Sequence, residues 1–286
     1  MDEPEVVGRY SPFLFKWFAR VSLRLVRKRF EAVRVLKGFE PAEGLAAGAM
    51  GGGVVVMNHP GWWDPMAAVV AARRWFPDQV HFAPMDEAML KSYPLMDRMG
   101  FFGIEQGTAR GGAAFMKTAV GVLRGGGDGA AKSVGVGGGR CLWVTGPGVF
   151  RDVRERPVEL MPGVARLAGR LARTGIEGPS PLDSEWVSVM AVEYVFWDQS
   201  RPEMLMAFGR AVPVGEVTVA GLEAEMERVM DALAAAAVER DAGLFEVVEM
   251  PWLTRKRVGV GGAYDGFRRL VSWMRGRRFD PGHGAA

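Results

Sequence analysis

Short apolar runs alternate with segments of helical periodicity along most of the chain. Strands are predicted at residues 54–57, 80–83, 101–104, 141–144, 187–195 and 204–208. Helices are predicted at residues 64–75, from about 86, and at 110–123, 164–173 and 222–238. Strands that alternate with helices are typical of α/β folds, whose sheet is buried from both sides. We therefore expect a central, mostly parallel or mixed sheet covered by helices.

A further helical pattern covers residues 11–36. Its apolar positions recur at spacings of three and four, and its basic positions follow another face: Leu14, Trp17, Phe18, Val21 and Leu25 against Lys16, Arg20, Arg24 and Arg27. Aromatic residues on one side and arginines on the other are typical of an amphipathic helix that lies in the membrane interface. A docking helix with a solvated basic face would show the same pattern.

Positive charge is concentrated at both ends of the chain, although the net charge is only +3. Residues 9–29 contain seven basic side chains and no acidic one, and residues 255–278 contain eight against one aspartate. Such asymmetry indicates an anionic partner, either a membrane or a nucleic acid. The basic segments carry apolar stripes suited to lipid and no recognisable nucleic-acid motif. We expect both ends to contribute to one membrane-facing surface, with no nucleic-acid partner.

Composition narrows the remaining possibilities. A single cysteine, Cys141, excludes an internal disulfide framework, and three histidines make a metal centre an unfavoured reading. No apolar run reaches the 18 to 20 residues or so of a spanning helix, and the acidic start argues against a signal peptide. We expect a peripheral protein on the cytoplasmic side of the cell membrane. Its parts would be a docking helix (1–40), an α/β domain (41–245) and a basic segment (246–286).

The sharpest candidate for chemistry is the segment NHPGWWD at residues 58–64. His59 follows a predicted strand and lies in a Pro-Gly turn, at the rim where α/β folds bind ligands. Asp64 falls where the next helix begins, so that the turn can bring its carboxylate to the imidazole. A carboxylate on one ring nitrogen leaves the other free to accept a proton from a hydroxyl. A capping aspartate beside an incidental histidine is the alternative reading.

This segment resembles the first motif, NHxxxxD, of the glycerolipid acyltransferase superfamily, of the lysophosphatidic acid acyltransferase type. Residues 101–105, 142–150, 160–168 and 189–194 are similar in order and spacing to the later motifs, so the resemblance covers about residues 50–210. It implies an acyltransferase-like fold and an O-acyltransferase of lipid metabolism, such as phospholipid biosynthesis. His59 would activate a hydroxyl of a lysolipid, glycolipid or other lipid-like acceptor. That hydroxyl would attack the thioester of acyl-CoA or acyl-carrier protein, with no cofactor.

The same resemblance implies further site residues, and some positions depart from it. Asn58 and Trp62 are candidate substrate-binding residues beside the proposed base. Trp62 and Trp63 could line an acyl groove, and packing beneath the following helix is an equal alternative. Backbone N–H groups at Gly146 and Gly148 could bind the oxyanion, although glycines that only make a turn are an equal alternative.

The arginine usual in the second motif is replaced by Glu105, so Arg110 is a candidate substitute. The third motif reads TGPG at residues 145–148, with Arg151 downstream as a possible phosphate ligand. Phosphate recognition is therefore expected to be altered.

Other readings of the chain stay open. The altered motifs favour a catalytically inactive membrane-binding protein of the same fold, while the intact Asn58, His59 and Asp64 favour an enzyme. A metal hydrolase built on the same histidine is the weakest candidate, because other ligands are scarce. His81 lies in a strand pattern and is expected to be structural, and His283 lies in a Gly-Pro-rich tail.

Overall fold

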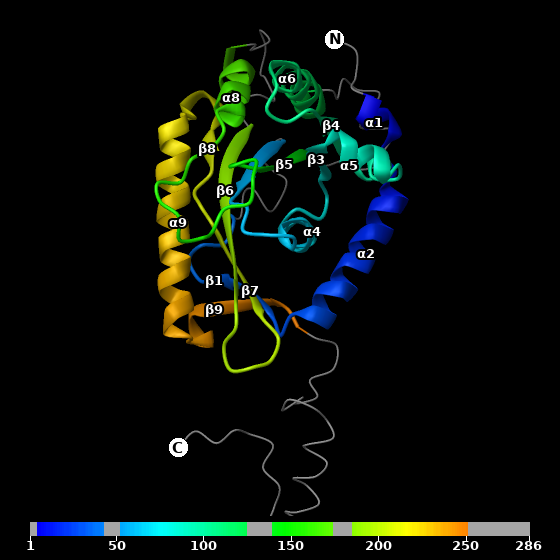
Figure 1. The fold of residues 1–286 in the computed structure, drawn as a ribbon. Coiled ribbons are helices and arrows are strands. Elements are labelled where there is room, and N and C mark those ends of the chain that lie inside the picture. The colour runs from blue at the N-terminus through cyan, green and yellow to red at the C-terminus, as the bar shows by residue number, and fades with distance from the viewer. Residues whose placement is uncertain (1–4, 43–51, 125–138, 174–184, 251–286) are drawn as a thin grey trace, which may run out of the picture.

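The computed structural model describes residues 5–42, 52–124, 139–173 and 185–250. These residues form an α/β fold in which helices flank a nine-stranded mixed sheet (Figure 1). The predicted fold class is confirmed at this level. The basic carboxyl-terminal segment from residue 251 onward, with His283, lies outside the described residues.

The helices and strands alternate along the chain much as the sequence pattern predicts. The strands are β1 (Val33–Leu36), β2 (Gly53–Met57), β3 (Val80–Asp86), β4 (Phe101–Ile104), β5 (Arg140–Thr145), β6 (Trp186–Val195), β7 (Glu203–Phe208), β8 (Val212–Pro213) and β9 (Phe245–Glu249). The helices are α1 (Glu5–Arg9), α2 (Pro12–Arg29), α4 (Asp64–Trp75), α5 (Glu87–Ser92), α6 (Ala109–Arg124), α8 (Gly163–Arg173) and α9 (Val219–Glu239). Short 3-10 turns are η1 (Asp97–Met99), η3 (Val214–Glu216) and η4 (Ala242–Leu244).

The sheet runs in the order β4-β3-β5-β2-β6-β7-β1-β9, with β8 paired to β6. The strands from β4 to β6 are all parallel, so their carboxyl ends lie at one edge. The direction reverses at β7, which pairs antiparallel with β6 and parallel with β1. Strand β9 pairs antiparallel with β1 and ends the sheet.

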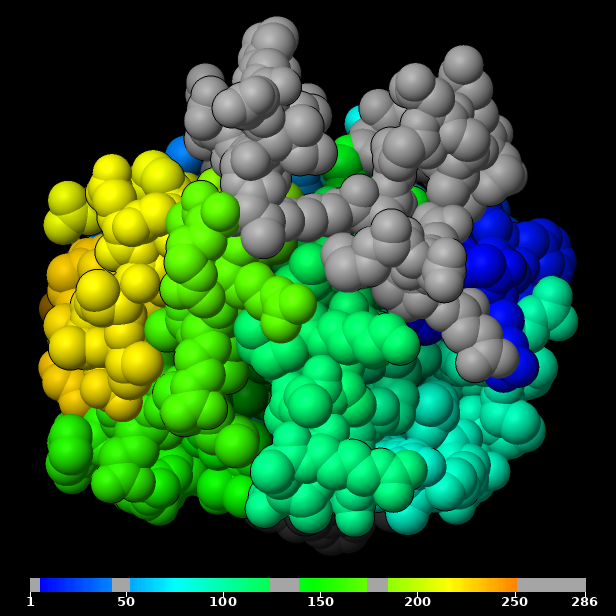
Figure 2. Space-filling model, turned by 90° about the horizontal axis from the view of Figure 1, so that it is seen from above, coloured from blue at the N-terminus to red at the C-terminus, as the bar shows by residue number. Residues whose placement is uncertain are grey.

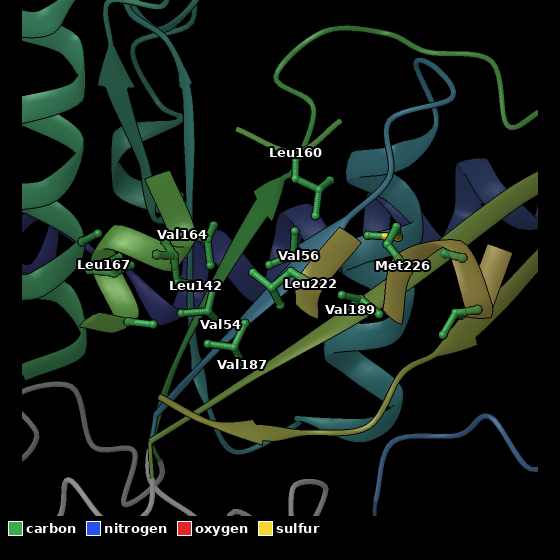
Figure 3. Close-up of a cluster of buried hydrophobic side chains, with 14 of the residues drawn as sticks. Val54, Val56, Leu142, Leu160, Val164, Leu167, Val187, Val189, Leu222 and Met226 are labelled. Carbon is green, nitrogen blue, oxygen red and sulfur yellow. The ribbon is translucent and has the colours of Figure 1, made fainter. Parts of the chain in front are cut away.

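Strand β2 lies inside the sheet and is buried along its whole length. Its side chains alternate between two hydrophobic clusters because successive residues of a strand point to opposite faces. Val54 and Val56 belong to the cluster that reaches α8 and α9, where Leu167 and Met226 pack (Figure 3). Val55 and Met57 belong to the second cluster, under α4 and the end of α2. Burial on both faces explains why the run is continuously apolar.

Helix α4 has the bounds that the sequence predicts. Its buried residues recur at helical spacing along the face that meets the sheet: Ala67, Val70, Ala71 and Ala72. Helix α2 packs in turn on α4 and on η1. On the other face, α6 lies between α8 and the side formed by α1 and α5 (Figure 2). None of the described helices combines the length and the apolar character needed to cross a bilayer.

The predicted helix over residues 11–36 is wrong at its end. Helix α2 stops at Arg29, and residues 33–36 form strand β1. The reason is local: Val33 and Val35 are β-branched and alternate with Arg34, a period-two pattern that favours a strand. The Arg34 Nε donates to Glu203 Oε2 of β7 at 2.9 Å, which fixes β1 beside that strand.

Candidate active site

The carboxyl ends of the parallel strands bring the predicted base and its neighbours to one rim of the sheet. His59 follows β2, Phe150 lies in the loop after β5, and Tyr194 lies near the end of β6. Because β5, β2 and β6 are adjacent and parallel, these three side chains meet although they are far apart in sequence. Ligands of α/β proteins bind at this edge.

His59 and Asp64 contact each other as the sequence predicts. The His59 Nδ1 lies 2.5 Å from Asp64 Oδ2, and the Gly61 N–H donates to the same oxygen at 3.1 Å. Asp64 is the first residue of α4, where the positive end of the helix dipole favours a carboxylate. The Asp64 side chain is fully buried, whereas 19% of the His59 side chain is exposed. The buried carboxylate therefore holds the imidazole on one side, and part of the ring remains exposed.

The second carboxylate oxygen has a partner that sequence reasoning missed. The Tyr194 hydroxyl donates to Asp64 Oδ1 at 2.6 Å. Burial, the negative charge of Asp64 and this hydrogen bond all raise the pKa of Tyr194, so the phenol stays protonated and acts as a donor. Tyr194 lies 130 residues after Asp64, and a tyrosine at the end of an apolar strand carries no signal of such a contact. The contact between Tyr194 and Asp64 follows only from the pairing of β2 with β6.

The hydrogen bonds around Asp64 bear on the ring protons of His59. With the carboxylate ionised, Oδ2 accepts from Nδ1–H and Oδ1 accepts from Tyr194, and Nε2 is then the ring nitrogen that can accept a proton. The Phe150 ring lies over the imidazole with 4.4 Å between the ring centroids. The backbone of His59 is fixed as well, because the Arg151 N–H donates to its carbonyl oxygen at 3.0 Å.

Asn58 has a structural position. Its Nδ2 donates to the Val192 carbonyl at 3.0 Å, and its Oδ1 accepts from the Val192 N–H at 2.8 Å. The side chain is buried and does not line the cavity beside His59. Asn58 therefore joins the end of β2 to β6 and supports the base from below.

A cavity of about 620 Å³ opens beside His59 and Asp64. Its walls are mostly apolar and come from one face of α4, from β3 to β5 and from Phe15 and Phe18 of α2. Trp62 also lines it and is 77% exposed. Trp63 points elsewhere and packs edge-on against Phe30.

The two glycines expected to bind an oxyanion have occupied N–H groups. The Gly146 N–H donates to the Met57 carbonyl at 2.7 Å, and the Gly148 N–H donates to the Thr145 carbonyl at 3.2 Å. Gly148 has a φ of +70°, and an added Cβ would lie 2.5 Å from the Met161 sulfur. These glycines make the turn after β5, which was the alternative reading, and Gly148 also contributes to the cavity wall.

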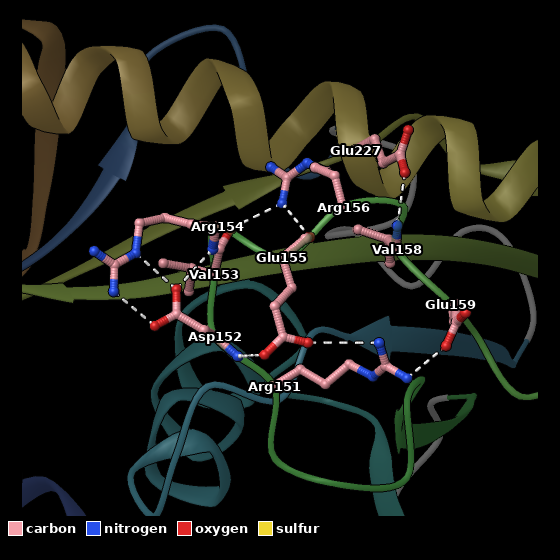
Figure 4. Close-up of polar contacts among 9 residues, drawn as sticks. All are labelled: Arg151, Asp152, Val153, Arg154, Glu155, Arg156, Val158, Glu159 and Glu227. Atoms are coloured by element: carbon pink, nitrogen blue, oxygen red, sulfur yellow. Dashed lines mark hydrogen bonds and ion pairs between the residues drawn. The ribbon is translucent and has the colours of Figure 1, made fainter.

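Arg151 and Arg154, which follow this turn, are paired with carboxylates (Figure 4). Arg151 contacts Glu155 and Glu159, at 3.5 and 2.5 Å. Arg154 forms two hydrogen bonds with Asp152, and Arg156 contacts Asp231.

Arg110 is exposed at the start of α6. Neither Arg110 nor Arg151 is among the residues that line the cavity. The backbone of Arg151 contacts His59, but the side chains of the two arginines expected to contact substrate do not line the cavity.

His81 lies in the cavity wall and is buried, as a structural histidine would be. Its Nε2 donates to the Phe76 carbonyl at 3.0 Å, and its Nδ1 accepts from the Trp143 indole at 3.2 Å. Burial lowers the pKa of His81 to about 4. Burial also raises the pKa of the Cys141 thiol. Among the described residues, no cluster of three or more His, Cys, Asp or Glu side chains could hold a metal ion.

Two comparisons with known proteins found no relative of this chain. No protein-family model matches the chain, and a search of curated proteins finds no significant match.

We predict that His81 makes the stability of the protein depend on pH. The unfolded state binds a proton near pH 6.5, but the native state does so only near pH 4, so stability falls as the pH decreases between these values. A shift of this size corresponds to about 3 kcal/mol. Urea unfolding of the wild type and His81→Gln at several pH values measures it. Glutamine does not titrate, so a constant difference between the two proteins would contradict the assignment.

Proposed function

We propose that the protein is an O-acyltransferase that moves a fatty acyl group from a thioester to the hydroxyl of a lipid-like acceptor. The observation that carries the proposal is the hydrogen-bonded His59–Asp64 pair in the wall of a mostly apolar cavity. The resemblance of residues 58–64 and the later motifs to the glycerolipid acyltransferase superfamily supports the same chemistry. The donor would be acyl-CoA or acyl-carrier protein, and the reaction requires no cofactor.

The proposed reaction uses the unprotonated Nε2 of His59 as a general base. It accepts the hydroxyl proton while the acceptor oxygen attacks the thioester carbonyl carbon. Asp64 stabilises the imidazolium that forms, as in serine hydrolase triads, but the nucleophile here belongs to the substrate. Collapse of the tetrahedral intermediate forms the ester C–O bond and breaks the C–S bond. The leaving thiolate takes the proton back from His59, so the enzyme returns to its starting state.

The cavity is suited to an acyl chain. Each buried methylene group gains about 0.8 kcal/mol, so a fatty chain gains most of its affinity from such walls. The face of α4 that lines the cavity begins at Asp64 and continues through Pro65, Ala68, Val69 and Ala72. A chain lying along this face would have its carboxyl end near His59. This arrangement supports an acyl thioester as one substrate.

Helix α2 supports the proposal that the protein binds to a membrane, peripherally and on the cytoplasmic side. Four exposed apolar residues follow one another at four-residue intervals and form what we call the α2 stripe: Phe13, Trp17, Val21 and Leu25. Four basic residues lie beside them with the same interval: Lys16, Arg20, Arg24 and Lys28. Exposed aromatic residues next to cations match the interface of an anionic leaflet.

In this proposal some residues of α2 line the cavity and others contact the membrane. Phe15 and Phe18 line the cavity, and Phe18 contacts Phe101 edge-on with 6.2 Å between centroids. The stripe lies on the exposed side of the same helix. A lipid that leaves the leaflet at α2 would therefore have only a short path to His59.

An inactive protein of the same fold is the main rival. Its support is the loss of the usual acidic and basic positions in the second and third motifs. Against it stands the buried and hydrogen-bonded Asp64, because a buried charge is costly and a chain without catalytic need gains little from keeping it.

We predict that His59→Ala lowers kcat for thiol release from acyl-CoA about 10²- to 10⁴-fold, because the general base is lost. Asp64→Asn should cause a comparable loss, whereas the matched Asp198→Asn, at an exposed position, should keep the wild-type rate. Circular dichroism checks that each variant is folded. If His59→Ala keeps the wild-type rate, the proposed mechanism is wrong.

We predict that monoacylglycerol is a better acceptor than lysophosphatidic acid of the same chain length. The two differ by one phosphate, and the guanidinium groups of Arg151, Arg154 and Arg156, in the segment after β5, already pair with carboxylates. We expect kcat/KM to differ about tenfold or more, because the desolvated phosphate would lack a partner. In the double variant Glu155→Gln/Glu159→Gln, Arg151 loses its two carboxylate partners and becomes available to the phosphate. The difference in kcat/KM between monoacylglycerol and lysophosphatidic acid should therefore decrease. A wild-type preference for lysophosphatidic acid would contradict this prediction.

We predict that the double variant Phe13→Ser/Trp17→Ser binds anionic vesicles at least about tenfold more weakly than the wild type, because two aromatic groups no longer enter the interface. Flotation with phosphatidylserine-containing vesicles, over a salt series, measures it. Val238→Ser is the matched control, since Val238 is 81% exposed on α9, away from α2. Equal flotation of all three proteins, or stronger binding to DNA than to vesicles, would overturn the membrane proposal.

A further inference from the structure

Asp64 accepts hydrogen bonds on both of its oxygens although it is fully buried. Oδ2 accepts from His59 Nδ1 and the Gly61 N–H, and Oδ1 accepts from the Tyr194 hydroxyl. His59 and Gly61 belong to the same turn as Asp64, whereas Tyr194 comes from β6. Among the residues that the structure describes, Tyr194 is therefore the one hydrogen-bond donor to Asp64 that is distant in sequence.

The pair of Asp64 and His59 shares one proton between two arrangements. In the first, the carboxylate is ionised and the ring proton is on Nδ1, so Nε2 is basic. In the second, the carboxyl group is protonated and donates to Nδ1, and the ring proton is on Nε2. Both arrangements hold the same number of protons and differ only in their positions. Only the first can remove a proton from an acceptor hydroxyl.

We propose that Tyr194 is a positioning residue that keeps Asp64 ionised and thereby holds His59 in its Nδ1–H tautomer. A hydroxyl that donates to Oδ1 stabilises the carboxylate and not the neutral acid. Without it, the buried carboxylate loses a partner, and burial favours its neutral form. The effect of Tyr194 on the His59 tautomer does not depend on what the protein does. Its effect on catalysis rests on the proposed acyl transfer.

The surroundings of Tyr194 fit this role. Its ring packs against Phe30, with 5.8 Å between centroids, and Phe30 in turn contacts Trp63 edge-on at 4.9 Å. The backbone of Tyr194 pairs with Met204 of β7. The hydroxyl is therefore held from two sides and directed at a carboxylate that has no solvent contact. Because the hydroxyl is already oriented, little reorganisation is needed when His59 becomes charged.

The ring tautomers can be read directly by long-range ¹H–¹⁵N NMR on the full-length protein. The chain has three histidines, and His81 supplies an internal reference in the same spectrum. Its Nε2 donates to Phe76 and its Nδ1 accepts from Trp143, so it should show the opposite tautomer to His59. Resonances are assigned with His59→Gln and His81→Gln.

In the wild type we expect His59 to show the Nδ1–H pattern. In Tyr194→Phe we expect the Nε2–H form to appear, with His81 unchanged. Tyr10→Phe is the matched control, because it removes the phenol hydroxyl of a half-buried tyrosine whose ring packs on Phe15 and Phe82. If the His59 pattern is the same in Tyr194→Phe as in the wild type, the proposal is overturned. A role in packing alone would alter stability and leave the tautomer as it was.

Kinetics separate this inference from the proposed function. If the protein is an acyltransferase, Tyr194→Phe should lower kcat about 10- to 100-fold with little change in KM, since one hydrogen bond to a charged group is lost. A tautomer change without transferase activity in the wild type would support the role of Tyr194 and refute acyl transfer. Full transferase activity together with an unchanged His59 tautomer in Tyr194→Phe would refute the role of Tyr194 and support acyl transfer.

A second measurement covers the case in which Tyr194→Phe does not fold. Replacing tyrosine throughout by 3-fluorotyrosine keeps the side-chain shape and makes the phenol a stronger donor. The stronger bond to Oδ1 should weaken the bond between Oδ2 and His59, so the low-field Nδ1 proton should move to higher field. The His81 proton should not move, and an unmoved His59 proton would overturn the proposal.

Discussion

The candidate site depends on one buried carboxylate. Moving an ion out of water costs several kcal/mol in a protein interior unless partners compensate it. Asp64 is compensated by the turn that contains it, by the start of α4 and by Tyr194 of β6. Each of these contacts requires a different part of the fold to be in place. The hydrogen-bonded environment of Asp64 is therefore a consequence of the tertiary structure, and the contact with Asp64 orients the His59 ring.

The pairing of β2 with β6 is the part of the fold that makes this possible. The two strands are parallel and in register up to Met57 and Met190. Just beyond them, Asn58 forms two hydrogen bonds with Val192. These bonds fix the level at which β2 ends relative to β6, and with it the distance from Asp64 to Tyr194. A polar side chain buried among apolar strands is thus explained by the position of the site.

Local signals in the sequence were sufficient for most of the fold and for the central pair. The interval of five residues between His59 and Asp64, after an apolar strand, predicts their contact because one turn connects them. Strand β1 was missed because a helical pattern runs directly into it. Tyr194 could not be found, since its contact depends on strand register and not on spacing. Hydrogen bonding by Gly146 and the ion pairs of Arg151 were equally hidden, because both partners are defined only by the folded loop.

A buried charge and the proposed lipid site can share one cavity. The attraction between an imidazolium and a carboxylate grows as water is excluded, so an apolar wall strengthens the pair that it surrounds. Helix α2 supplies part of that wall with Phe15 and Phe18, and its exposed surface carries the α2 stripe. If the stripe binds lipid as proposed, docking presses the same helix toward the cavity. Membrane binding and exclusion of water from His59 would then be one event, because a single helix carries both.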